Sequence, residues 1–308
     1  MSASHETPDH RSTWLGLGTA FLLALIIAAW LLSTTRQPAP WEGAVELRTL
    51  PTMPAAALAK RFDEAGHTWP PEGPVPALSV RTMPSDMGEL RAPERKALFF
   101  RIMLPLALAE NRRIEAQRAW IRAVLPGSSR PQPESADAAR LRDLAERYKV
   151  DPELPARELR QRLLHRADTL PPALILVQAA NESGWGTSRF TQQANNLFGV
   201  WTYNPEEGIR PRQAGVGTTH SVRLYDDLQH SVRGYIHNIN AGHAYADLRE
   251  LRAQRRASGN GVTAHALAAG LERYSERGQE YIDELRSMME NNDLPGLNLR
   301  QIALADNQ

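Results

Sequence analysis

The stretch that decides the fold is PPALILVQAANESGWGTSRF, residues 171–190. Its two prolines suit the first turn of a helix, and the five residues after them carry no polar side chain, so this helix must be buried. Its polar side chains lie three and four residues apart and therefore share one face: Gln178, Asn181 and Glu182. The glycines at 184 and 186 then end the helix. The stretch predicts a buried helix with Glu182 in its last turn.

This predicted position of Glu182 has a chemical consequence. The negative end of a helix dipole disfavours a carboxylate, and so does an apolar neighbour such as Trp185, so both raise the pKa of the carboxyl group. A glutamic acid that stays protonated near neutral pH is what a glycosidase needs as its general acid. Glu182 is therefore the first catalytic candidate, and a solvated helix end is the competing interpretation.

Upstream of this stretch the pattern is helical. After Pro93, apolar residues recur at one-turn spacing: Leu98, Phe99, Ile102, Met103 and Leu106. Charged residues lie off this stripe: Glu94, Arg95, Lys96, Arg101 and Glu110. The pattern predicts an amphipathic helix, kinked by Pro105, that ends near Val124. A proline-rich break over 126–133 separates it from further helices at 135–149 and 156–167.

The N-terminal third has a different character. After a short tail over 1–13, residues 14–33 contain no charge and are long enough for a helix to cross a bilayer. We expect an uncleaved membrane anchor there, in preference to a cleaved signal peptide. Residues 38–93 then hold ten of the 22 prolines, which favours an extended spacer over 34–93 rather than a packed domain.

Composition excludes several classes of protein. A net charge of +1 gives no large field for binding nucleic acid, and the absence of cysteine excludes disulfides, thiolate zinc sites and a cysteine nucleophile. The histidines of the C-terminal half have no metal-ligand spacing, so we expect neither a metal nor a cofactor: His220, His230, His237, His243 and His265.

The residues around Glu182 carry a family resemblance. ANESGWGTSRF followed by QANNLFGVW, with THSVRLYDDLQHSVRGYIHNINAGHAYADLR and LERYSERGQEYIDEL downstream, resembles the glucosaminidases of glycoside hydrolase family 73, nearest to their bacterial Bax-protein branch. The resemblance covers about 94–300. It implies a mainly α (α+β) fold, a lysozyme-like helical domain over 134–300 with a small β-hairpin lobe beside the cleft. Residues 94–133 are then an amphipathic helical segment before this domain, and 301–308 a tail.

The resemblance also implies an activity and its residues. The family cleaves the glycan backbone of peptidoglycan after N-acetylglucosamine; Glu182 matches its catalytic acid, and Tyr274 matches a tyrosine proposed to line the cleft. Aromatic side chains that follow the acid are candidates for stacking on sugar rings: Trp185, Phe198, Trp201 and Tyr203. Core packing is the stronger interpretation for Trp185 and an equal one for Phe198. Tyr235 is a further substrate-binding candidate, on a helix for which a scaffold role is favoured.

One departure from the family affects the mechanism. Many relatives carry a second acid in the hairpin lobe, and Ser221 stands at the equivalent position here. The remaining acids nearby are better explained as loop or helix-cap residues: Glu206, Glu207, Asp226 and Asp227. Hydrolysis by water activation needs a second carboxylate, whereas attack by the sugar's own acetamido oxygen does not. We therefore favour substrate assistance, with Tyr274 supporting the intermediate.

Three functions stay open at this point. The first is a peptidoglycan hydrolase held in the inner membrane by residues 14–33, with its catalytic domain in the periplasm. The second is a lytic transglycosylase, for which the single acid Glu182 suffices. The third is a catalytically inactive wall-binding module. The membrane orientation follows from the family's substrate and not from the flanking charges.

Overall fold

The centre of the fold is α3 (Ala92–Val124), a helix of 33 residues. It continues through Pro105 and ends at Val124, as predicted. The amphipathic pattern is wrong over 98–110, because every residue there is buried. Arg101 and Glu110, expected on the solvent face, are instead paired with other side chains: Arg101 donates to the Asp63 carboxylate over 2.6 Å, and Glu110 accepts from Arg233 over 2.8 Å.

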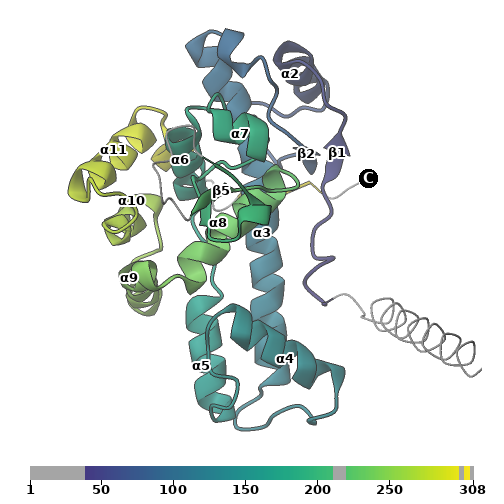
Figure 1. The fold of residues 1–308 in the computed structure, drawn as a ribbon, viewed down its shortest axis with the longest axis vertical. Coiled ribbons are helices and arrows are strands. Elements are labelled where there is room, and N and C mark those ends of the chain that lie inside the picture. Colours follow the sequence, from purple (N-terminus) through teal and green to yellow (C-terminus); the bar gives the residue numbers. More distant parts are fainter. Residues whose placement is uncertain (1–38, 211–219, 298–301, 306–308) are drawn as a thin grey trace, which may run out of the picture. The chain divides into compact units, whose positions relative to one another are not determined.

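The structure is a computed structural model that describes residues 39–210, 220–297 and 302–305. Residues from Pro40 onward form one compact, mainly helical unit (Figure 1). Its remaining α-helices are α2 (Ala55–Glu64), α4 (Ala136–Arg147), α5 (Ala156–Arg166), α6 (Pro172–Ser183), α7 (Arg189–Ala194), α8 (Leu228–Ala241), α9 (Ala246–Ala257), α10 (Ala264–Ala268) and α11 (Gln279–Glu290). Short 3₁₀ helices are η1 (Met87–Glu89), η2 (Pro205–Glu207), η3 (His243–Tyr245), η4 (Ala269–Leu271) and η5 (Leu294–Leu297).

Two small sheets accompany the helices. β1 (Arg48–Leu50) and β2 (Leu78–Val80) pair in parallel, with Arg48 opposite Leu78. The second sheet is the antiparallel hairpin lobe, in the order β3 (Trp201–Thr202), β5 (Ser221–Arg223), β4 (Gly208–Ile209). Thr202 lies opposite Ser221, and Ile209 lies opposite Val222. The mainly helical fold with a small hairpin lobe is therefore confirmed.

The predicted spacer over 34–93 is wrong for the described residues from 40 onward. Leu58 and Phe62 of α2 are fully buried and join the same hydrophobic core as α3. Trp69 stacks on Phe100 with ring centroids 4.6 Å apart, and Trp41 packs edge-on against Trp120. Prolines break this region into short elements, but the apolar residues between them are numerous enough to dock on α3.

The helices predicted after the proline-rich break are confirmed as α4 and α5. Ser135 caps α4, since its side-chain oxygen accepts from the amide of Ala138. The predicted membrane anchor at 14–33 lies outside the described residues. Across the stretches that the structure does describe, no helix is long and apolar enough to span a bilayer.

Helix α6 is the buried helix expected from the sequence. Residues 172–180 are all buried, and the helix packs against α3, α10 and α11. A helix without polar residues on most of its surface needs such neighbours on several sides. This packing holds the C-terminal end of α6 beside α11, where the candidate site lies.

Candidate functional site

Glu182 lies in the last turn of α6, as predicted. The helix ends because Gly184 adopts the left-handed conformation, with φ of 56°, and the amide of Trp185 donates to the carbonyl of Ala180 over 2.9 Å. A left-handed residue after a helix strongly favours glycine, which has no Cβ to clash. This ending fixes the direction in which Glu182 leaves the helix.

The surroundings of Glu182 favour its protonated form. Burial raises the pKa of its carboxyl group, and hydrogen bonds from Tyr281 and Asn181 oppose this without cancelling it. Two opposite charges lie near, on Arg277 and Glu284, and these form an ion pair with each other. Desolvation of the carboxyl group is therefore the dominant effect on the pKa of Glu182.

A chain of hydrogen bonds from three helices leads to Glu182. The hydroxyl of Tyr235 on α8 donates to Oε1 of Gln178 on α6, and Nε2 of Gln178 donates to the hydroxyl of Tyr281 on α11 over 3.1 Å. That hydroxyl in turn donates to Oε1 of Glu182 over 2.8 Å. Tyr235, Gln178 and Tyr281 are all buried, so each has one favourable orientation. The chain holds Oε1 of Glu182 through Tyr281, and the side chain of Asn181 gives the carboxyl group a further hydrogen bond.

Sequence reasoning missed Tyr281, the residue that contacts Glu182 directly. It lies 99 residues away in the sequence, so no local pattern connects the two. Gln178 was placed on the Glu182 face, but its role as a link between two tyrosines requires the positions of α8 and α11. The available signal was the polar spacing on an otherwise apolar helix.

Tyr274, the predicted catalytic tyrosine, lies one layer away from the acid. Its hydroxyl donates to the carbonyl of Phe198 over 2.8 Å, and its ring stacks on Tyr281 with centroids 5.4 Å apart. Within the described residues no hydrogen bond joins Tyr274 to Glu182. Its position therefore supports Tyr281 from the side and connects it to the loop before the hairpin lobe.

That loop approaches Oε2 of Glu182. Gly199 has φ of 64°, and a Cβ built on it would lie 3.9 Å from Oε2 of Glu182. The loop is held by Asn196, whose Nδ2 donates to the carbonyls of Val200 and Arg223, each over 2.9 Å. Asn196 thus fastens the loop to the hairpin lobe. The positive φ at 199 favours glycine in this loop.

The predicted aromatic residues separate into two groups. Trp185 packs edge-on against Phe99 and Phe100 of α3, with centroids 5.8 and 5.2 Å apart, so the core interpretation is correct for it. Phe198 is buried and stacks on Tyr235, with centroids 4.0 Å apart. The substrate-binding prediction is therefore wrong for the side chains of Phe198 and Tyr235, because neither reaches the surface.

The other two aromatic residues are exposed on the hairpin lobe. Trp201 is 50% exposed and Tyr203 is 81% exposed. Trp201 also lines a cavity of about 600 Å³ between the lobe and the helices, together with Arg223 and His237. Exposed aromatic faces suit the apolar faces of sugar rings. These two residues remain the candidates for substrate contact.

The hairpin lobe offers no buried acid among its described residues. Ser221, at the position expected for the second acid, is buried in β5, so a hydroxyl group and not a carboxylate lies there. Asp227 caps α8 by accepting from the amide of His230, and Glu207 pairs with Arg223 over 3.5 Å. Glu206 and Asp226 are exposed. These are the loop and cap roles that the sequence predicted. In the described parts of the chain, no group of three His, Cys, Asp or Glu side chains is arranged to hold a metal ion.

Comparisons with known proteins indicate the family of this chain. Residues 158–294 match the Glucosaminidase family, described as mannosyl-glycoprotein endo-beta-N-acetylglucosaminidase, within the predicted domain. The chain is 34% identical over 199 residues to Protein bax of Escherichia coli (strain K12), covering 64% of this chain and 70% of the relative. The crystal structure of the catalytic domain of the autolysin Auto from Listeria monocytogenes can be superposed on 59% of this chain. The match includes 87% of the Auto chain, at 17% identity and a TM-score of 0.32. From the family match and the bax relative, the chain belongs to the glucosaminidase family of glycoside hydrolase family 73 type.

Proposed function

We propose that the protein cleaves the glycan backbone of peptidoglycan as an endo-β-N-acetylglucosaminidase, with Glu182 as the general acid. One observation carries this proposal: a partly buried glutamic acid whose pKa is raised, held through one oxygen by Tyr281. A general acid contributes by donating a proton to the leaving oxygen in the transition state. Membership of a glucosaminidase family supports peptidoglycan as the substrate.

The geometry suggests how the proton is delivered. Tyr281 donates to Oε1 of Glu182, so we assign the transferable proton to Oε2, the oxygen near Gly199. A glycosidic oxygen placed there receives this proton as its bond to the anomeric carbon breaks. The positive charge that develops on the sugar ring then needs stabilisation.

The absence of a buried acid on the described hairpin lobe favours substrate assistance. In this mechanism the acetamido oxygen of N-acetylglucosamine attacks the anomeric carbon, and the resulting ring intermediate is later opened by water. Glu182 first donates its proton and then, as a carboxylate, accepts one from the water. Tyr274 and Tyr281 form the aromatic wall on one side of the acid, and Trp201 and Tyr203 provide stacking surfaces on the lobe.

A lytic transglycosylase would also use a single acid, so the products decide between the two reactions. Purified full-length protein is incubated with peptidoglycan beside Glu182→Gln and, as matched control, Glu153→Gln, an exposed acid on the loop before α5. Mass spectrometry then identifies the new chain ends. Reducing N-acetylglucosamine ends made by wild type and Glu153→Gln, but not by Glu182→Gln, are the expected result. Anhydro-muramic ends would assign the transglycosylase, and no release by any protein would assign a binding module.

The cellular location is a separate part of the proposal. An uncharged run at 14–33 supports a single-pass anchor in the inner membrane, and a peptidoglycan substrate supports a periplasmic catalytic unit. The test is cell fractionation of the full chain and of a chain lacking 1–38, with protease added to spheroplasts. We expect the full chain in the membrane fraction, and we expect the protease added outside the spheroplasts to digest its catalytic unit. A full chain found with the soluble proteins, or protected from the protease, would contradict this placement.

A further inference from the structure

A second cavity lies at the opposite end of α6 from Glu182. It has a volume of about 550 Å³ and is enclosed by α3, the segment that leads into α6, Arg256 at the end of α9, and residues 302–304. Pro172 at the first turn of α6 lines it. Ten residues of helix at about 1.5 Å each separate this end from Glu182 by about 15 Å. The cavity is therefore distinct from the catalytic site and is not used by the reaction described above.

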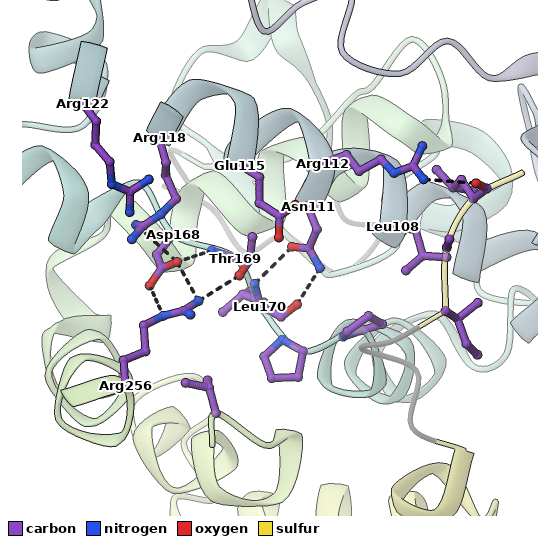
Figure 2. Close-up of a pocket in the computed structure, with 16 residues that line it drawn as sticks. Leu108, Asn111, Arg112, Glu115, Arg118, Arg122, Asp168, Thr169, Leu170 and Arg256 are labelled. Atoms are coloured by element: carbon purple, nitrogen blue, oxygen red, sulfur yellow. Dashed lines mark hydrogen bonds and ion pairs between the residues drawn. The ribbon is translucent and has the colours of Figure 1, made fainter. Parts of the chain in front are cut away.

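One end of this cavity has an excess of positive charge. Asp168 is buried and is approached by three guanidinium groups: Arg118 at 3.3 Å, Arg252 at 3.4 Å and Arg256 at 2.8 Å. Arg122 lies on the same face of α3, one turn after Arg118, and also lines the cavity. Figure 2 shows the guanidinium groups of Arg118 and Arg256 around Asp168, with Arg122 beside them. The lining holds two carboxylates, on Asp168 and Glu115, against the guanidinium groups of Arg112, Arg118, Arg122 and Arg256, so positive charge is in excess.

The excess of positive charge also affects the pKa of Arg118. Burial lowers its pKa, and the positive charges of Arg122 and Arg256 lower it further, against the effect of Asp168. Arg122 is exposed and, within the described residues, has no hydrogen bond or ion pair. Its guanidinium group is free to take a ligand. Guanidinium groups bind carboxylates through two parallel hydrogen bonds, so an anion at this end would be held by charge and by geometry.

The other end of the cavity mixes polar and apolar side chains, and Asn111, Arg112 and Glu115 are its polar ones. Its lining there includes Leu108, Leu170, Val262, Ile302 and Leu304. Arg112 closes this end by donating to the carbonyl of Leu304 over 3.1 Å, as Figure 2 shows. A cavity with a cationic end and a mixed polar and apolar lining fits a ligand that has a carboxylate on a short chain with further polar groups, such as a peptide. Its volume lies in the range of sites for small molecules and short peptides, well above that needed for a single ion.

We propose that this cavity binds the carboxylate-bearing peptide stem of peptidoglycan, with Arg118 and Arg122 contacting the carboxylate. The proposal rests on the proposed function for its choice of peptide, because a glycan-cleaving enzyme meets these stems on its substrate. A stem of three extended residues spans about 10 Å, which lets a peptide bind here while its glycan strand lies elsewhere on the protein. Such a site would hold substrate without taking part in bond cleavage.

The test measures peptide binding directly and needs no catalysis. The free tripeptide L-Ala-γ-D-Glu-diaminopimelate is titrated by calorimetry into full-length Glu182→Gln protein at low and high salt, with inorganic phosphate as a second probe. Arg122→Ala and Arg122→Glu are compared with Arg142→Glu, an exposed arginine on α4 that does not line the cavity. Arg122 makes no contacts that the fold needs, so these variants are expected to keep the melting temperature of the parent protein.

We expect the tripeptide to bind and to bind less tightly at high salt. Arg122→Ala weakens binding, Arg122→Glu weakens it by about tenfold, and Arg142→Glu leaves it unchanged. No binding of the tripeptide, equal binding to Arg122→Glu, or phosphate binding as tightly as the tripeptide would overturn the proposal. Because digestion is measured separately, a protein that cleaves peptidoglycan without binding the tripeptide disproves only this inference. A protein that binds the tripeptide without cleaving disproves only the proposed activity.

Discussion

The two sides of the candidate site are built in opposite ways. On the helical side, Glu182 is joined through Tyr281 and Gln178 to Tyr235, and all three of these partners are buried. On the hairpin lobe, Trp201 and Tyr203 are exposed. The buried side fixes the orientation of Glu182, the proposed proton donor, whereas the lobe presents exposed side chains whose mutation should change the stability of the fold little. The side chains with fixed orientations are therefore those around Glu182, the proposed proton donor.

This difference implies that the same kind of mutation has different effects on the two sides. A change on the helical side should alter catalysis, stability or the pH dependence. A change on the lobe should alter substrate binding alone. Four experiments test this contrast, and they are described from the largest expected effect to the smallest.

The largest effect is expected for the acid itself. Glu182→Gln keeps an oxygen that can accept from Tyr281 but has no proton to transfer, so kcat/KM should fall by about 10²–10⁴-fold. Glu207→Gln, on the lobe, should retain nearly full activity, because Glu207 is exposed and pairs with Arg223. Rates are measured by release of soluble fragments from labelled peptidoglycan. Equal losses in the two variants would show that the lobe supplies a second catalytic acid.

Truncation of an aromatic side chain should separate stability from binding. Phe198→Ala removes a buried ring and should destabilise the fold by about 3–5 kcal/mol, measured by urea unfolding. Trp201→Ala removes a half-exposed ring, so the free energy of unfolding should change by less than about 0.5 kcal/mol while KM rises severalfold. If Trp201→Ala unfolded the protein, the lobe would be part of the core after all.

A smaller effect is expected for the hydrogen bond to the acid. Tyr281→Phe removes a donor that lowers the pKa of Glu182, so this pKa should rise further. Glu182 then stays protonated to higher pH, and the alkaline limb of the pH profile of kcat/KM should move upward. The lost hydrogen bond should also cost about 1 kcal/mol of stability. Tyr203→Phe is the control, and a matching shift in that variant would exclude a specific role for Tyr281.

The smallest effect concerns stability and pH. Since the pKa of Glu182 is raised in the fold, the folded protein holds this proton more tightly than the unfolded chain does. Stability from this group is complete below the unfolded pKa and is lost as pH rises through the folded pKa. Glu182→Gln should therefore melt slightly above wild type at pH 7, and this difference should vanish below about pH 4. A lower melting temperature of the variant at pH 7 would contradict the raised pKa.

The sequence predicted those parts of the site that depend on local pattern. The apolar run into Glu182 and the glycines after it gave the buried helix, its end and the acid at that end, because capping and periodicity are local properties. Tyr281 and the loop at Gly199 could not be predicted in this way, since they reach Glu182 only through the packing of α11 and the hairpin lobe. Phe198 is buried and Trp201 is half-exposed. The local sequence does not distinguish them, because both are aromatic residues that follow Glu182 closely.

The N-terminal region was misread for a related reason. Proline content suggested a spacer, but the spacing of Leu58 and Phe62 on a short helix was the stronger signal. Arg101 and Glu110 were assigned to solvent because they are charged, and the partners that permit their burial lie far away in the sequence. Glu110 also pairs with Arg113 on the same helix, but its pairing with Arg233 and the pairing of Arg101 with Asp63 cannot be seen along one helix.

The packing of residues from 40 onward against α3 would limit the distance between the compact unit and the proposed anchor. With the proposed anchor ending at residue 33, only residues 34–39 lie between it and the compact unit. Six residues span at most about 20 Å, whereas an extended spacer over 34–93 would have spanned several times that distance. The first residue of the compact unit would then lie within about 20 Å of the end of the anchor. The targets of the catalytic unit would be the glycan strands nearest the membrane, and strands in outer layers would be beyond its reach.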